Sequence, residues 1–215
     1  MARATRVPRL AALAAAGVLA LSGCGIHPGK AAVVGSSDIS VDEVDTTAAV
    51  VCVVDQSVGG VQSIARRKAM EFLIGAELIE EFGRDRGQTP TGSQLSASPA
   101  LDQIQNDAQT LPEDLRQDYI DIITRLVETQ QTLINVGFLK AAEDGTGADG
   151  ALAEGSQQYS AWLADEAPEV SVDPRFGKWE GSALVPGDSS LSVAVSEMAT
   201  QAGQGVDLPA TQVCS

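Results

Sequence analysis

The sequence has little histidine and few aromatic residues: His27 is the single imidazole, and Phe, Trp and Tyr make up 4% of the chain. Catalytic sets of the Ser-His-Asp and Cys-His kinds need an imidazole inside a pocket, and His27 lies in a short Gly- and Pro-containing segment. Zinc sites built on histidine and cysteine fail for the same reason. We therefore expect no catalytic residue and no metal, and an exposed His27.

Basic residues are scarce as well. Beyond the first 23 residues the chain has 11 Lys and Arg against 29 Asp and Glu, a net charge of −18. A groove for nucleic acid needs clustered basic residues, so nucleic acid is excluded as a partner. The acidity also does not favour adhesion to anionic lipid by overall charge. The one tight basic cluster, Arg66-Arg67-Lys68, is interpreted as a solvated helix face.

Motifs for cofactors are weak. Gly145 to Gly150 matches the G-x-G-x-x-G string of dinucleotide-binding proteins, but a helical pattern precedes it where that motif needs a strand. Asp118 and Asp121 lie on the polar side of a predicted helix, which indicates a charged surface rather than general acid-base chemistry. The sequence therefore predicts no small-molecule cofactor.

The first 21 residues have the pattern of a secretory signal. Arg3, Arg6 and Arg9 precede an apolar run from Leu10 to Leu21, and small residues follow. That run is shorter than the roughly 20 apolar residues that cross a bilayer, so it predicts a removable segment and not a permanent anchor.

Leu21-Ser22-Gly23-Cys24 resembles the bacterial lipobox. The resemblance implies a signal peptide over 1–23, a diacylglycerol on Cys24 and a lipidated tether over 24–30. It also implies a place at the cell membrane, lipid-anchored on the extracytoplasmic face, because acyl chains can hold a protein there. The alternative is an ordinary signal-peptidase site beside an unused thiol.

With Cys24 assigned to lipid, two cysteines remain, Cys52 and Cys214. An even pair in an oxidising compartment predicts a disulfide that joins the first helix to the C-terminal end. Two separate buried thiols are the alternative.

The fold class expected from the patterning is mainly α, with a small pairing of two strands. The apolar run 31–35 predicts a strand, and Ser40 with Glu43 predicts a capped helix to about Gln56. Apolar residues at helical spacing predict a second helix over 61–82 and a shorter one over 98–110.

The longest periodic segment begins after Pro112 and predicts an arm of around 30 residues. A loop is expected over 144–150, with Asp149 capping a last helix from Ala151 to about Ala167. Residues 170–172 predict a strand that pairs with the first one, 173–179 a turn, and 181–215 an irregular tail packed on the helices.

This order of elements over residues 31–180 resembles the N-terminal domain of the SurA and PrsA chaperones. The strings that carry the resemblance are Ala32-Val33-Val34-Gly35 followed by Ile39-Ser40-Val41-Asp42-Glu43-Val44, then Gly87-Gln88-Thr89-Pro90-Thr91 after a long helix. Val170 to Trp179 is similar to the returning strand of actinobacterial members, with its Pro-Arg-Tyr/Phe-Gly-x-Trp ending. The resemblance implies an elongated helical domain.

One departure limits what the resemblance implies. Full-length members carry a parvulin-type prolyl isomerase domain before the last helix, and residues 143–150 stand in its place here. The resemblance therefore implies a non-catalytic, chaperone-like role in binding unfolded or exported polypeptides. Leu115, Tyr119, Ile122 and Leu126 on the long helix are candidate contacts, although the same residues could be core. The alternatives are a scaffolding lipoprotein that binds one envelope partner and an isomerase-related enzyme.

Overall fold

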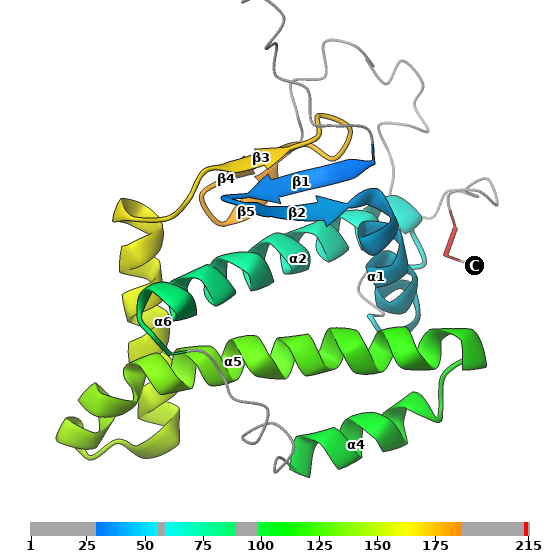
Figure 1. Ribbon diagram of the computed structural model, residues 1–215. Helices are drawn as coiled ribbons and strands as arrows, with labels where there is room; N and C mark the ends of the chain where they lie inside the picture. The colour runs from blue at the N-terminus through cyan, green and yellow to red at the C-terminus, as the bar shows by residue number, and fades with distance from the viewer. Residues whose placement is uncertain (1–28, 56–58, 89–98, 186–212, 215) are drawn as a thin grey trace, which may run out of the picture.

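The computed structural model describes residues 29–55, 59–88, 99–185 and 213–214. The described chain is mainly α-helical, as expected, and its helices stack beside a small sheet (Figure 1). The lipidation candidate Cys24, His27 and most of the expected tail lie outside the described residues.

The sheet has three strands in the order β2-β1-β3: β2 is Ser37–Ser40, β1 is Lys30–Val34 and β3 is Val170–Val172. The expected pairing of the first strand with the returning strand is confirmed, with Val33 opposite Ser171 in an antiparallel register. The second strand, β2, was not expected. Gly35 has a left-handed φ of 57°, which allows a tight turn between β1 and β2. The two strands therefore pair as a hairpin.

Helix α1 (Val41–Val54) begins where its cap predicts, since the Ser40 hydroxyl accepts a hydrogen bond from the Glu43 N–H at 3.0 Å. Helix α2 (Gln62–Asp85) follows and lies along one face of the sheet. The core forms between them from Val34 and Ile39 of the sheet, Val44 of α1, and Met70, Leu73, Ile74 and Phe82 of α2.

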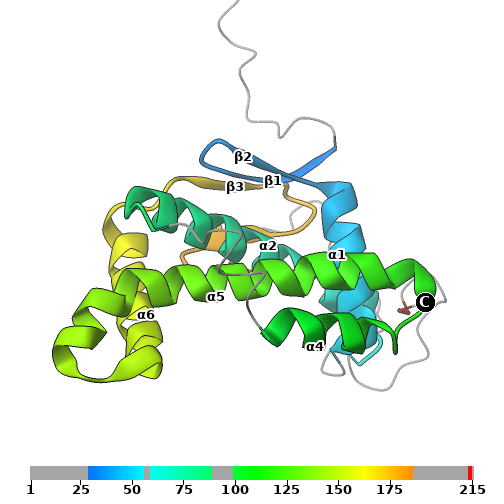
Figure 2. The same ribbon diagram turned by 60° about the horizontal axis from the view of Figure 1, so that its bottom comes forward.

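Helix α4 (Pro99–Ala108) and a 3₁₀ turn, η2 (Glu113–Leu115), lead into α5 (Arg116–Asp144), the predicted arm. Helix α5 runs beside α2 on the side away from the sheet, and α4 lies against its N-terminal half (Figure 1, Figure 2). Helix α6 (Gly147–Asp165) crosses the other end of α5 steeply and returns to the sheet.

The expected loop over 144–150 is wrong. Helix α5 ends at Gly145, whose φ of 71° allows the Thr146 N–H to bond the Ala141 carbonyl at 3.0 Å, and α6 begins at Gly147. Asp149 lies inside α6 and is not its cap. Left-handed backbone at Gly145 and at Gly147, whose φ is 67°, completes the reversal over two connecting residues, so Gly150 lies inside α6.

The expected irregular tail is corrected at its start. Residues Lys178–Glu180 (β4) and Ala183–Val185 (β5) pair as a hairpin, and the Leu184 N–H donates to Glu71 of α2 at 3.3 Å. At the other end, the Cys214 N–H donates to the Gly60 carbonyl at 2.8 Å, and Cys52 and Cys214 form a disulfide. Trp179 therefore lies in a strand and not in a turn.

Candidate functional site

The long helix α5 buries little of its apolar surface. Its fully buried residues are Thr129, Thr132, Gly137 and Ala141, whereas its larger apolar side chains are half-buried or exposed. Leu133 and Val136 are the residues of α5 that pack, partly buried, against the main core. Most of the large apolar residues that recur along α5 therefore lie outside that core.

Five residues on α5 follow one another at intervals of four or seven, which places them on one side of the helix. We call this set the apolar row: Tyr119, Ile123, Val127, Ile134 and Phe138. Each is half-buried except Phe138, which is 59% exposed. The row starts beside α4, where burial and the carboxylate of Asp107 raise the pKa of Tyr119, and ends near α6.

A cavity of about 430 Å³ lies where the row ends. We call it the α5–α6 cavity. It is lined by apolar and amide side chains of α5 and by the first residue of α6: Gln131, Ile134, Asn135, Phe138, Ala141, Ala142 and Gly147. Its volume falls in the range, roughly 300–1,000 Å³, of pockets that hold small ligands, so it can accept large apolar side chains.

The crossing of α5 and α6 fixes the shape of this cavity. A Cβ atom at Gly137 would lie 2.0 Å from the Ala151 carbonyl oxygen, and one at Gly155 would lie 1.9 Å from the Leu133 carbonyl oxygen. The two helices approach so closely that backbone contacts backbone. Small residues at the crossing therefore hold α6 steeply across α5 and leave Phe138 uncovered.

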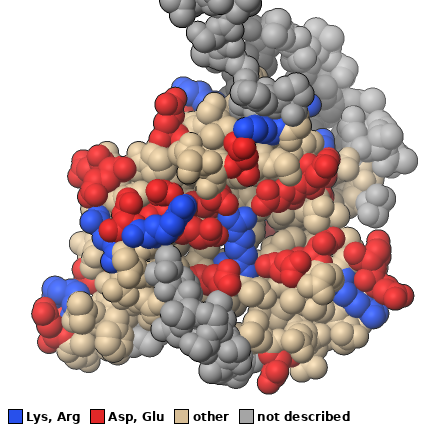
Figure 3. Space-filling view, in the orientation of Figure 1, with Lys and Arg blue, Asp and Glu red and all other residues tan. Residues whose placement is uncertain are grey.

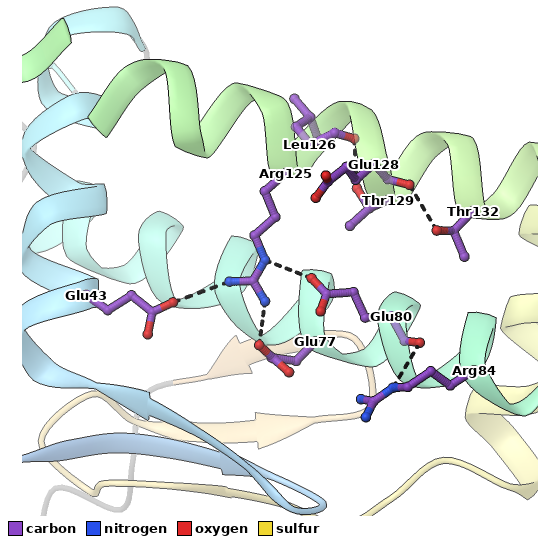
Figure 4. A network of polar contacts seen from close by, with 9 residues as sticks. All are labelled: Glu43, Glu77, Glu80, Arg84, Arg125, Leu126, Glu128, Thr129 and Thr132. Atoms are coloured by element: carbon purple, nitrogen blue, oxygen red, sulfur yellow. Dashed lines mark hydrogen bonds and ion pairs between the residues drawn. The ribbon is translucent and has the colours of Figure 1, made fainter. Parts of the chain in front are cut away.

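A polar lock holds the middle of α5 against the other helices (Figure 4). The Arg125 guanidinium donates to Glu80 at 2.9 Å and to Glu43 at 3.3 Å, and it also pairs with Glu77. Burial alone would lower the pKa of Arg125, but the carboxylates of Glu80 and Glu77 raise it above its usual value. We call this set the Arg125 lock; it joins α5 to α1 and α2 through one cation.

An aromatic cluster holds α6 against the end of α2. The rings of Phe82, Tyr159 and Trp162 lie 5.5 to 6.0 Å apart, and the Trp162 indole N–H donates to Asp85 at 2.9 Å. Burial raises the pKa of Tyr159 to about 12. The cluster holds the C-terminal part of α6 against α2, while α6 also packs on α5.

The surface around these helices is acidic. Asp and Glu side chains gather along α2 and α5 on the face shown in Figure 3. No group of three or more His, Cys, Asp or Glu in the described ranges has a geometry that could hold a metal ion. Among the helices described, none is long and apolar enough to cross a membrane.

The candidate contacts are separated by the structure. Leu115 is half-buried in the 3₁₀ turn η2, just before α5, and Tyr119 and Ile122 are half-buried on the half of α5 beside α4. Leu126, further along α5, is 48% exposed. Ile134 and Phe138, which line the cavity, were not among the candidate contacts predicted from the sequence. Their position depends on where α6 crosses, and only Gly137 with Gly155 could have indicated it.

No family model matches this chain, and neither a curated protein nor a solved structure is significantly similar to it.

Proposed function

We propose that this protein is a lipid-anchored lipoprotein on the extracytoplasmic face of the cell membrane, where it holds unfolded exported polypeptides without catalysis. The observation that supports the proposal is the apolar row of α5, which stays outside the main core and ends at the open α5–α6 cavity. Exposed apolar surface beside a cavity is a feature of sites that bind other molecules.

The chemistry of the surface fits an unfolded client. An apolar segment of polypeptide can lie on the end of the row that α4 leaves uncovered, at Ile134 and Phe138, and place one or two side chains in the cavity, as amphipathic segments do in hydrophobic grooves. Gln131 and Asn135 line the cavity, and the Gln131 amide N–H donates to the Asn135 side-chain carbonyl oxygen at 2.9 Å. The Gln131 side-chain carbonyl and the Asn135 amide N–H can bond the client backbone. The acidic surface around the helices repels other copies of the chain, which keeps the open end of the row at Phe138 free.

The test uses the mature chain with Cys24→Ser, which cannot be lipidated. We expect it to suppress aggregation of a reduced, unfolded client at stoichiometric ratios, measured by light scattering. Phe138→Asp should remove most of the suppression, because it places a charge at the mouth of the cavity. A properly folded wild-type domain, checked by circular dichroism, that suppresses nothing rejects the proposal.

Leu139→Asp is the matched control. Leu139 is the neighbouring residue, is 75% exposed and lies about 100° around the helix from Phe138, away from the cavity lining. The two variants lose similar apolar surface and gain the same charge. Suppression should survive in Leu139→Asp, and equal loss in both variants would contradict a role for the cavity.

The anchor is tested separately in cells. Wild-type protein should incorporate a labelled fatty acid and sediment with membranes, and Cys24→Ala should do neither. Crosslinking in the same cells should give many client bands. A single reproducible band would favour a scaffold with one envelope partner, and clear catalysis in a proline-isomerisation assay would favour the isomerase-related alternative.

A further inference from the structure

A second cavity, of about 210 Å³, collects cationic side chains in this acidic protein. Its lining is Val41, Ser63, Arg66, Arg67, Arg175 and Phe176, and we call it the arginine cavity. Three of the 11 basic residues beyond residue 23 therefore line the arginine cavity, and no carboxylate lines it. The cluster at 66–68, interpreted above as a solvated helix face, is in part the wall of this hollow.

The arginines are arranged to receive an anion. The guanidinium groups of Arg66 and Arg175 each lie 5.9 Å from the centre of the Phe176 ring, on which they can stack. Arg66 is paired with Asp45, and Arg175 is paired with Asp173, outside the lining. Arg67 is exposed and has no ion-pair partner in the part of the chain that the structure describes.

Serine and the start of α2 add hydrogen-bond donors. Ser63 lies in the first turn of α2, and the residue before that helix, Val61, provides no side-chain cap. The leading N–H groups of a helix favour an anion, and guanidinium groups bind phosphate oxygens in pairs. The cavity therefore matches an anion such as a phosphate group better than an apolar or cationic ligand.

The cavity also lies where the chain leaves the tether. The N–H of Val41, in the cavity wall, donates to the Gly29 carbonyl at 2.9 Å, and the N–H of Asp173, two residues before Arg175, donates to the Ala31 carbonyl at 2.8 Å. Cys24 precedes Gly29 by five positions, a span of at most about 17 Å when extended. A lipid on Cys24 would hold this side of the domain at the membrane surface.

We propose that the arginine cavity binds the phosphate of an anionic phospholipid headgroup and so sets the orientation of the domain on the membrane. The inference rests on the lipid attachment at Cys24 proposed above. The attachment supplies an effective concentration in the millimolar range, so a weak site suffices. The remaining acidic surface is repelled by the same lipids, which leaves the arginine cavity as the face that turns to the membrane.

The experiment couples the mature chain through its Cys24 thiol to a maleimide lipid in vesicles. This is selective because Cys52 and Cys214 are joined to each other. Arginine side chains are then modified with phenylglyoxal and mapped by mass spectrometry. The arms are phosphatidylcholine vesicles, the same vesicles with phosphatidylglycerol, and phosphatidylcholine vesicles with millimolar inorganic phosphate.

With phosphatidylglycerol, we expect the reactivity of Arg66, Arg67 and Arg175 to fall about twofold or more, as for a site more than half occupied at tether concentrations. Arg84 and Arg86, at the far end of α2, should react equally in all arms and serve as internal controls. Arg67→Ala with Arg175→Ala should abolish the protection of Arg66, and Arg84→Ala with Arg86→Ala should retain it.

Three results would overturn the proposal: equal reactivity in the two lipid arms, equal shielding of Arg84 and Arg86, or full protection by inorganic phosphate alone, which would indicate a site for free phosphate. The chemical coupling makes the result independent of lipidation in cells. The fatty-acid labelling in cells therefore tests the proposed anchor, and the arginine reactivity on vesicles tests the headgroup site separately.

Discussion

Gly137 in α5 and Gly155 in α6 lie where the two helices cross, and neither position has room for a side chain. Alanine at either one must push the helices apart, since the obstructing atoms are backbone. We expect Gly137→Ala and Gly155→Ala each to lower the free energy of unfolding by about 1–3 kcal/mol, as overpacking does. Urea denaturation followed by circular dichroism measures the change.

Gly75→Ala is the control for this pair. Gly75 is inside α2, and a Cβ there would meet nothing within 4 Å. The substitution should raise the free energy of unfolding by roughly 0.5–1 kcal/mol, because alanine restricts the unfolded chain and favours helix. If all three substitutions shifted stability in the same direction, the close helix crossing would be wrong.

The Arg125 lock makes a second prediction at the residue scale. Arg125→Met would leave Glu43, Glu77 and Glu80 facing one another without a cation. Losing one partner of a buried ion pair costs about 3–5 kcal/mol, and the partial exposure of Arg125 reduces our expectation to about 2–3 kcal/mol. Chemical denaturation tests it.

Two further variants make that prediction specific. Lys140→Met breaks the exposed pair with Asp144 on the same helix and should leave the stability unchanged within error. Adding Glu77→Gln to Arg125→Met should recover part of the loss, because it removes a repelling carboxylate. No recovery would mean that Arg125 stabilises the fold by packing alone.

At the scale of elements, the helices and strands with regular apolar patterns were predictable from the sequence. The places where the helices cross were not. Helix α5 follows from a long apolar period that starts after Pro112, and α1 follows from the Ser40 cap. The pairing of β1 with β3 also follows from two short apolar runs. The arm was predicted because local spacing alone determines it.

The errors fall on glycine turns and on sites made by distant elements. Gly145 turns the chain in two residues, and no local pattern distinguishes such a glycine from one in a longer loop. The arginine cavity joins segments far apart in the sequence, Arg66 with Arg175. The α5–α6 cavity is lined by residues 131–147 alone, but its shape depends on where α6 folds back across α5. Helical spacing predicts which side of α5 is apolar, but it does not predict which part of that side another helix covers.

The packing of α6 on α2 predicts a dependence on pH. The folded pKa of Tyr159, about 12, lies above its ordinary value near 10, so between these values the folded state keeps a proton that the unfolded state loses. The free energy of unfolding should therefore be unaffected below pH 10 and fall above it, by at most about 1.4 kcal/mol per pH unit.

Urea denaturation between pH 9 and 11.5 measures this fall, with phenolate absorbance as a direct readout. Tyr159→Phe should flatten the pH dependence. Tyr119→Phe is the comparison, since the pKa of Tyr119 is also raised but the tyrosine lies on α5, outside the aromatic cluster. Because Tyr119 contributes a slope of its own, the slope should be smaller in Tyr159→Phe than in Tyr119→Phe. Equal slopes in the two variants would contradict the buried position of the Tyr159 phenol.

At the scale of the whole molecule, the Cys52–Cys214 disulfide joins residues 162 positions apart. Cross-links that close long loops stabilise by restricting the unfolded chain, so Cys52→Ser with Cys214→Ser should cost about 2–5 kcal/mol. A reducing agent should shift the urea midpoint of the wild type by the same amount and leave the double variant unaffected. Client suppression should persist in the folded variant, because the disulfide lies at the α1 end, opposite α6 (Figure 1).

The pairing of β1 with β3 has a consequence for when the sheet can form. Strand β1 pairs with β2 on one side and with β3, residues 170–172, on the other, and β3 is synthesised much later than β1. Loop closure over such a distance delays folding, and under the proposed export β1 would emerge outside the cell before its partner β3 does. The sheet can therefore close only after β3 has emerged, by which time the start of the chain is already fixed at the membrane through the proposed lipid.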